Sequence, residues 1–163
     1  MEQIALINPE NVSEADAVEF KIREAARAVV FDDENYVALL YASQYGYYKL
    51  PGGGIEKDED PEIALKRECA EEIGCNIKIE RKLGVVLEYR KRYGLKQTSH
   101  CYIAKLIGIK GRPTLMEDEI EEGFQTIWMP IEEAIKKVQN GRRDKYETQY
   151  MIPRDLAFLE ATI

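Results

Sequence analysis

The segment from Gly52 to Gly74 constrains the fold of this chain more than any other, because it joins a glycine run to a well-delimited helix. The glycines at 52–54 let the backbone adopt left-handed or strained angles and approach a ligand closely. Asp60 then suits the N-cap, Pro61 the first helical position, and Gly74 the C′ position. We therefore predict a glycine loop followed by a short helix between Pro61 and Gly74.

This helix carries two stripes that run side by side. The apolar stripe, at i, i+4 and i+8, consists of Leu65, Cys69 and Ile73. The acidic stripe, at i, i+3 and i+4, consists of Glu68, Glu71 and Glu72. Neighbouring carboxylates repel one another, and a hard divalent cation relieves that repulsion. We predict a metal site, with Mg²⁺ as the expected ion and Mn²⁺ as a plausible substitute.

The spacing of the segment is specific. Five residues separate Gly53 from Glu59, and seven more separate Glu59 from the run Arg67-Glu68-Cys69-Ala70-Glu71-Glu72-Ile73-Gly74-Cys75. This pattern resembles the Nudix box, the signature of the MutT-like Nudix hydrolase family, and every specified position is met. The apolar positions of the box hold Cys69 and Cys75, which is a mild departure.

The resemblance implies an α/β fold, the Nudix-type α/β/α sandwich with a mixed β-sheet, and a single Nudix domain over residues 1–163. It implies that Glu59 pairs with Arg67 to hold the loop against the helix, so that the metal-binding carboxylates point correctly. The carbonyl of Gly53 is implied as a further metal ligand. For residues 1–20 the alternatives are an extra strand, a loose N-terminal arm and a dimer contact, so a homodimer stays open.

Hydrophobic periodicity and turn residues predict the remaining elements. The expected strands cover 22–31, 36–41, 77–89, 97–107 and 124–129, with a turn at 32–35 and a hairpin tip at 90–94. Two helices are expected to close the chain, one from Pro130 to Gln139 and one over 144–160 with a kink or break at Pro153.

An acidic loop at 117–123 precedes the strand that carries Trp128. Some similar Nudix enzymes place a catalytic glutamate in such a loop, and Glu122 has the corresponding offset from the tryptophan. Glu122 is therefore a candidate metal ligand or general base, with Glu119 and Glu121 as competitors. The alternative is an exposed acidic loop without a role in the site.

Basic and aromatic side chains supply the candidates for substrate binding. Arginine forks match phosphate oxygens in a bidentate manner, and tyrosine rings can stack on a nucleobase. The candidates are Arg23, Arg27, Tyr48 (in a cluster with Tyr45 and Tyr47), Arg90 and Arg92. Alternatively, Arg90 and Arg92 belong to a solvated hairpin tip, and Arg23 and Arg27 are likewise solvated surface residues. The alternative for the tyrosines is packing in the core or at a sheet edge.

Composition restricts the partners. A net charge of −7 over 163 residues lacks the basic footprint of a nucleic-acid binder, so no nucleic-acid partner is expected. The apolar runs are too short to span a bilayer and the N-terminus has no basic region, so we expect no membrane partner and a cytoplasmic location. The three cysteines are expected to be buried and reduced, and His100 to be a packed or surface residue of a strand.

The resemblance thus implies a Mg²⁺-dependent pyrophosphohydrolase that cleaves a nucleoside diphosphate linked to a moiety X, using a metal-activated water. Its catalytic candidates are Glu59, Arg67, Glu68, Glu71, Glu72 and Glu122. A (deoxy)nucleoside triphosphate of the mutator type is the first expected substrate, because the chain is small. The alternatives are a dinucleoside polyphosphate hydrolase, suggested by Tyr93, and a catalytically silent nucleotide-binding module. Arg90 and Lys91 stand where ADP-ribose hydrolases of the family tend to carry proline, which argues against that class.

Overall fold

The computed structural model describes residues 2–163. Its central layer is a mixed eight-stranded sheet with the strand order β1-β6-β7-β2-β3-β4, to which β5 adds on β2 and β8 on β3. The strands are β1 (Gln3–Ile7), β2 (Lys21–Phe31), β3 (Tyr36–Ala42), β4 (Tyr47–Lys49), β5 (Gly52–Gly54), β6 (Asn76–Arg90), β7 (Leu95–Ile107) and β8 (Phe124–Pro130). The helices are α1 (Glu14–Ala17), α2 (Pro61–Ile73), α3 (Glu117–Glu121), α4 (Ile131–Gln139) and α5 (Thr148–Ala161), with a 3₁₀ turn η1 at Lys91–Tyr93.

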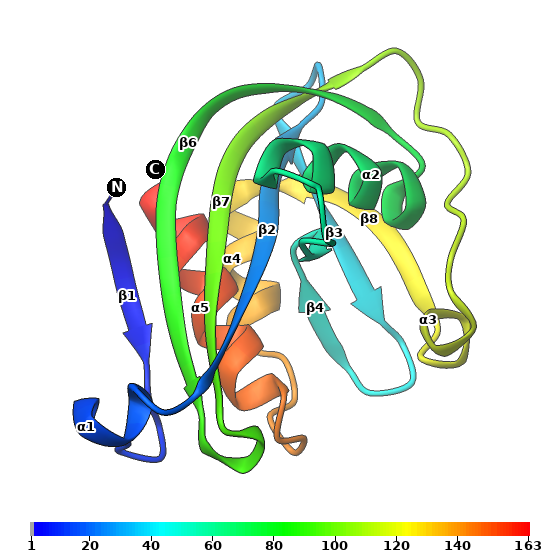
Figure 1. Cartoon of the computed structure of the whole chain (residues 1–163). Helices are drawn as coiled ribbons and strands as arrows, with labels where there is room; N and C mark the ends of the chain where they lie inside the picture. The colour runs from blue at the N-terminus through cyan, green and yellow to red at the C-terminus, as the bar shows by residue number, and fades with distance from the viewer. Residues whose placement is uncertain (1) are drawn as a thin grey trace.

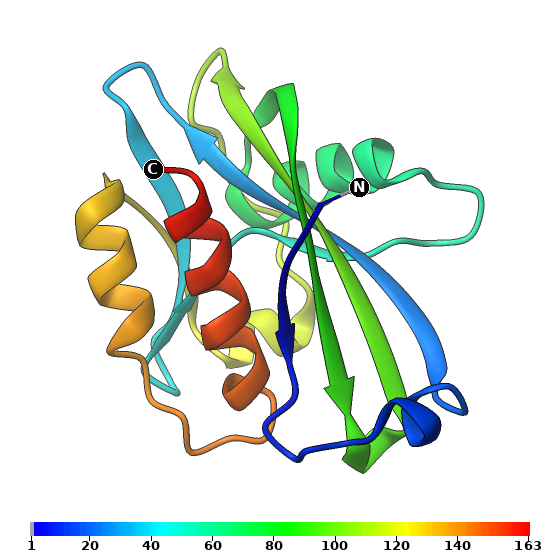
Figure 2. The same ribbon diagram turned by 90° about the vertical axis from the view of Figure 1, so that its left-hand side faces the viewer.

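Helices cover both faces of the sheet (Figure 1). Successive side chains of a strand point to opposite faces, so β2 contributes to two separate buried clusters. On one face Val30 packs in a cluster with Leu65 of α2, and on the other Val29 packs in a cluster with Phe158 of α5. Figure 2 shows α4 and α5 side by side on the second face. The α/β/α sandwich with a mixed sheet is therefore confirmed.

The beginning of the chain forms the extra strand, which was one of the three alternatives. β1 pairs in parallel with β6 and forms the edge of the sheet. The short helix α1 follows, with the Ser13 side chain accepting a hydrogen bond from the Asp16 backbone N–H at its N-terminus. Among residues 2–163, none of the helices combines the length and apolar character that crossing a bilayer requires.

The helix of the Nudix box has the predicted ends. The Asp60 side chain accepts from the Ile63 backbone N–H at 2.8 Å, Pro61 opens the helix, and Gly74 closes it with φ of 66°. Cys69 and Ile73 are buried against the sheet, as the apolar stripe predicted. All three cysteines, which include Cys75, are buried and free.

Three predictions about local structure were wrong. The tip of the long hairpin is shorter than predicted, because β6 extends through Arg90 and only η1 and Gly94, with φ of 56°, make the turn. The acidic segment is not a loop but the helix α3, in which the Glu119 side chain accepts from the Met116 backbone N–H at 2.7 Å.

The last helix also differs from its prediction. It begins at Thr148 rather than Asp144 and continues through Pro153 to Ala161 without a break. Proline removes one helical hydrogen bond, but the buried side chains Ile152 and Phe158 on either side hold both halves of α5 against the sheet. Packing therefore outweighs the local penalty.

Candidate active site

A cleft of about 880 Å³ lies where the sheet divides. β2 pairs with β3 only at Phe31 and Val37, next to the turn, and then pairs with β5 through residues 25–27. Side chains from the helices on both faces therefore reach the same opening. The cleft is lined by α2, β5, β2 and α3, and also by residues 148, 151 and 154 of α5.

The glycine run allows the close approach that its sequence predicted. A Cβ atom added at Gly53 would lie 2.5 Å from Oε1 of Glu68, and one added at Gly52, where φ is 143°, would lie 2.1 Å from the carbonyl oxygen of Ala26. At Gly52 the neighbour is backbone and φ is positive, so only glycine fits there. At Gly53 a Cβ atom would displace the Glu68 carboxylate, which lies directly against the loop.

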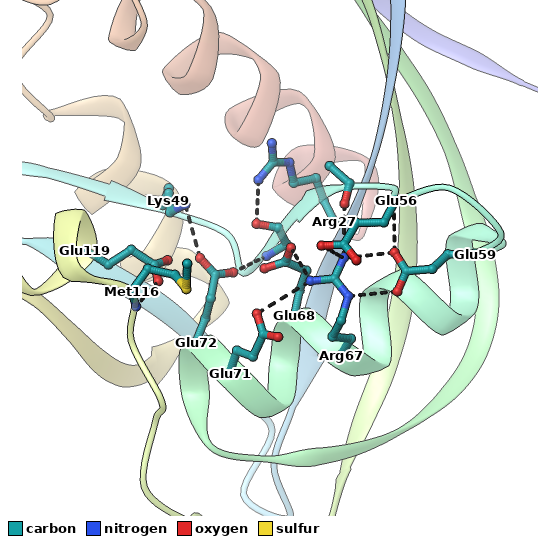
Figure 3. A network of polar contacts seen from close by, with 12 residues as sticks. Arg27, Lys49, Glu56, Glu59, Arg67, Glu68, Glu71, Glu72, Met116 and Glu119 are labelled. Carbon is teal, nitrogen blue, oxygen red and sulfur yellow. Dashed lines mark hydrogen bonds and ion pairs between the residues drawn. The ribbon is translucent and has the colours of Figure 1, made fainter.

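The three carboxylates of the acidic stripe line the cleft together. Glu72 is almost fully buried, and its Oε1 accepts from the Gly52 backbone N–H at 2.7 Å while its Oε2 lies 3.3 Å from Nζ of Lys49. Glu68 and Glu71 lie 3.0 and 3.5 Å from Nη1 of Arg67 (Figure 3). The stripe therefore lines the cleft directly beside the glycine loop.

Arg67 holds the loop to the helix, as the resemblance implied. Its Nε and Nη2 donate to the two carboxylate oxygens of Glu59 at 2.7 and 2.9 Å, and Nη2 also lies 3.2 Å from the Gly54 carbonyl oxygen (Figure 3). Hydrogen bonds from Arg67 lower the pKa of Glu59 to about 2. The pair is thus ionised and positions the neighbouring carboxylates.

The donor set fits a hard divalent cation by its chemistry. Across residues 2–163, no group of three or more His, Cys, Asp or Glu side chains already stands around one point to hold a metal ion. Instead, the box carboxylates pair with Arg67 and Lys49. Burial and, after it, the charge of Glu72 raise the pKa of Glu68. A divalent cation bound between the two carboxylates would relieve their repulsion. Carboxylate oxygens are the ligands that Mg²⁺ and Mn²⁺ prefer.

The helix α3 brings two glutamates into the cleft. Glu122 lines it and accepts a hydrogen bond from the Tyr47 hydroxyl at 3.0 Å. Glu119 also lines it and extends toward Glu72 in Figure 3. Burial is the largest cause that raises the pKa of Glu119 to about 7, and the charge of Glu72 acts in the same direction. Glu121 is exposed and does not line the cleft.

The structure divides the candidates for substrate binding. Arg23, Arg27 and Arg90 line the cleft. Tyr48 and Arg92 do not line it: the Tyr48 ring stacks on Tyr41 with a centroid distance of 4.5 Å, and the Arg92 guanidinium lies 4.1 Å from the centre of the Tyr146 ring. Arg90 is buried at the end of β6 rather than exposed at a hairpin tip.

Sequence reasoning missed several residues of the cleft. Lys49 lines it, and so does Tyr47, which the sequence named only as a member of the tyrosine cluster; both alternate with Tyr48 along β4 and point to the opposite side. Strand alternation was the signal that could have found them. Arg154, from α5, also lines the cleft and is fully buried. Its signal was a charged Arg154-Asp155 pair within the apolar closing helix, but no pattern linked that helix to the box.

Comparison with known proteins identifies the family. The family model of the NUDIX domain matches residues 21–149. The chain belongs to the Nudix family, which confirms the predicted family and the predicted class of enzyme, a hydrolase acting on phosphoric anhydride bonds. The matched residues include the box helix, the glycine loop and α3, so the cleft lies largely within the family domain.

Two curated relatives and one solved structure illustrate the family. The chain is 32% identical over 123 residues to a CMP-5'-(N-acetyl-N-hydroxy-3-aminopropyl)phosphonate hydrolase of Streptomyces rubellomurinus, covering 72% of this chain and 56% of that relative. It is 32% identical over 132 residues to diphosphoinositol polyphosphate phosphohydrolase 2 of Rattus norvegicus, covering 80% of this chain and 70% of that protein. A NUDIX hydrolase from Nitrosomonas europaea has the same fold, with a TM-score of 0.60 at 17% identity over 83% of this chain and 92% of that one.

Proposed function

We propose that this Nudix protein hydrolyses a phosphoanhydride bond in a nucleoside diphosphate derivative with the help of Mg²⁺, for which Mn²⁺ can substitute. The observation that carries the proposal is the acidic stripe Glu68, Glu71 and Glu72, which lies beside the glycine loop in a cleft that arginines also line. The three carboxylates and the Gly53 carbonyl would hold the cation. When bound, such a cation lowers the pKa of a water and offsets charge on the phosphates.

The residues of the chain have separate tasks in this proposal. Arg67 and Glu59 hold the glycine loop against the box helix, and in this way they position the carboxylates. A glutamate of α3, either Glu122 or Glu119, accepts the proton of the attacking water. Arg23 and Arg27 on β2 bind phosphate oxygens and balance the charge that develops as the anhydride bond breaks.

For the substrate, a (deoxy)nucleoside triphosphate of the mutator type is the first candidate. The small cleft-forming domain needs no additional recognition domain for such a ligand, and Tyr47 and Phe124 offer aromatic surface in the cleft. The second candidate is a substrate with more phosphates, such as a dinucleoside polyphosphate. The arginines along one wall favour it, and so does the relative that acts on diphosphoinositol polyphosphates. A silent nucleotide-binding module is disfavoured, because every glutamate of the box is present.

Product analysis across a nucleotide panel tests the proposal. Nucleoside triphosphates, dinucleoside polyphosphates, ADP-ribose and diphosphoinositol polyphosphates are incubated with Mg²⁺, with Mn²⁺ and with EDTA, and products are followed by ³¹P NMR in ¹⁸O-labelled water. Metal-dependent pyrophosphate release from triphosphates supports the first candidate. Faster cleavage of dinucleoside polyphosphates supports the second. Nucleotide binding without turnover under every metal condition would leave the silent module.

A further inference from the structure

The buried wall of the cleft opposite the box helix carries donors without partners. Among residues 2–163, four buried arginine nitrogens make no hydrogen bond: Nε of Arg27, Nε of Arg90, and both Nη1 and Nη2 of Arg154. These residues are 6%, 9% and 0% exposed, and all three line the cleft. Buried donors are nearly always satisfied in folded proteins, so this group needs an explanation.

The carboxylates hydrogen-bonded to these arginines do not balance their charge. Both oxygens of Asp155 are engaged: its Oδ1 accepts from Nε of Arg154 at 2.7 Å and its Oδ2 from the Leu50 backbone N–H at 2.9 Å. Oε1 of Glu88 accepts from Nη2 of Arg90 at 3.1 Å and lies 3.7 Å from Nη1 of Arg154, which is an ion pair but too long for a hydrogen bond. Arg27 donates to the Gly52 carbonyl oxygen rather than to a carboxylate, and Asp155, Glu72 and Glu88 act on it only through their charge.

Neighbouring guanidinium groups of this wall repel one another electrostatically. Burial, followed by the charge of Arg154, lowers the pKa of Arg27 to about 10. Burial, followed by the charge of Arg90, lowers the pKa of Arg23 at the rim. Guanidinium groups stay protonated in proteins, so the unpartnered donors of this wall carry positive charge and can bind an anion.

A purely structural role explains only part of the arrangement. A hydrogen bond to Asp155 within α5 accounts for Nε of Arg154, and one to Glu88 within β6 accounts for Nη2 of Arg90. The ion pair between Arg154 and Glu88 joins the two elements. These contacts leave the two terminal nitrogens of Arg154 without a hydrogen bond at the cleft. Those nitrogens form the fork that matches two oxygens of a phosphoryl group.

We propose that Arg90 and Arg154 form a second anion subsite, next to Arg27, that accepts a phosphate-type group of the ligand other than the anhydride under attack. The existence of the subsite does not depend on catalysis. That its occupant belongs to the substrate rests on the proposed function. The substrate class would then be one whose leaving moiety carries its own phosphate.

The first experiment measures binding of inorganic phosphate by isothermal titration calorimetry, in EDTA and at constant ionic strength. Arg90→Gln and Arg154→Lys should weaken binding about tenfold or more, because neither replacement offers the arginine fork. Arg81→Gln, on the exposed part of the same strand β6, is the matched control for loss of one positive charge and should bind as the wild type does. Equal affinities in all four proteins would overturn the subsite, and so would equal weakening in all three variants.

The second experiment compares a nucleoside triphosphate with the corresponding tetraphosphate. If the subsite holds the distal phosphate of the substrate, Arg90→Gln should raise KM more for the tetraphosphate, and inorganic phosphate should compete with it. If Arg90→Gln binds phosphate more weakly but has the wild-type ratio of KM for the tetraphosphate to KM for the triphosphate, the subsite exists but binds free phosphate rather than the substrate. Absence of turnover on both nucleotides would contradict the first candidate substrate of the proposed function, while the calorimetry still decides the subsite.

Burial of Arg154 makes folding of its variant a concern. Circular dichroism and melting curves of each variant check this, and Arg90→Gln decides alone if Arg154→Lys does not fold. A measurement on the wild type needs no variant: the arginine side-chain resonances in ¹⁵N NMR should shift saturably with phosphate for the buried guanidinium groups. Shifts confined to exposed arginines would overturn the proposal.

Discussion

Two glutamates of the α3 segment compete for the role of general base, and their surroundings differ. The carboxylate of Glu122 is hydrogen-bonded by the Tyr47 hydroxyl, whereas Glu119 is influenced by the charge of Glu72. A base must take a proton close to the site of attack, so proximity to the box carboxylates favours Glu119.

We therefore expect Glu119→Gln to lower kcat by about 10²-fold and Glu122→Gln to lower it less. Glu121→Gln, exposed on the same helix, is the control and should retain the wild-type kcat. Steady-state kinetics of the three variants on the best substrate provide the measurement. A larger loss in Glu122→Gln would return the role to the residue that the sequence pattern indicated first.

The ion pair between Glu59 and Arg67 should make stability depend on acid. Hydrogen bonds from Arg67 lower the pKa of Glu59 from 4.5 to about 2, so the folded state favours the ionised carboxylate. A group with a depressed folded pKa stabilises the fold above its unfolded pKa and loses that contribution as pH falls through the folded value.

The difference in free energy of unfolding between wild type and Glu59→Gln should therefore be constant near neutral pH and shrink as pH falls from 4.5 toward 2. Urea titrations at a series of pH values measure it. Asp144→Asn, which removes an exposed ion pair with Arg142 at 2.9 Å, is the control for loss of one surface charge. A difference that does not vary with pH would mean that the pair does not stabilise the loop.

At the scale of elements, the box helix α2 and the strand β5 form one unit that concentrates negative charge. Glu68, Glu71 and Glu72 lie on one helix, and the metal-free fold relies on Arg67 and Lys49 as their partners. A cation that binds only the folded state stabilises it by about 2.7 kcal/mol at 100 times its Kd.

Millimolar Mg²⁺ should therefore raise the Tm of the wild type by roughly 5–10 °C. Glu71→Gln should melt at or above the wild-type temperature in EDTA, because one repulsive charge is gone, yet gain less from Mg²⁺ because a ligand is lost. Paired melting curves of both proteins in EDTA and in Mg²⁺ provide the test. Equal shifts in the two proteins would show that Glu71 is not part of the metal site.

At the scale of the whole molecule, β1 covers an edge of the sheet that would otherwise be exposed. It pairs with β6, and its side chains Ile4 and Ile7 pack against the core on the α5 side. No residue of β1 lines the cleft. Exposed strand edges promote pairing with other chains.

Deletion of residues 1–7 should lower Tm and cause concentration-dependent association, while kcat of the folded fraction stays unchanged. Light scattering over a concentration series and kinetics well below Tm measure the two effects. Association of the wild type that disappears on deletion would instead favour the dimer contact considered for this segment.

Much of the box could be predicted because its signals are local. The helix ends follow from the capping side chain of Asp60 and from the left-handed Gly74, and the carboxylate stripe follows from helical periodicity. Bidentate pairing of Glu59 with Arg67 followed from the resemblance to the family. By contrast, the choice of Tyr48 over Tyr47 was wrong for the cleft because it ignored which side of β4 each residue occupies.

The sequence by itself determined the family, the box helix, the acidic stripe and the alternation of strands and helices, since each depends on residues close together in the chain. Only the tertiary structure decided which distant residues share the cleft. β2 leaves β3 for β5, and at this division of the sheet Arg154 of α5 pairs with Glu88 of β6 and lines the same cleft as Arg90 and the box helix. Contacts of such sequence separation depend on the packing of both faces, which no local pattern encodes.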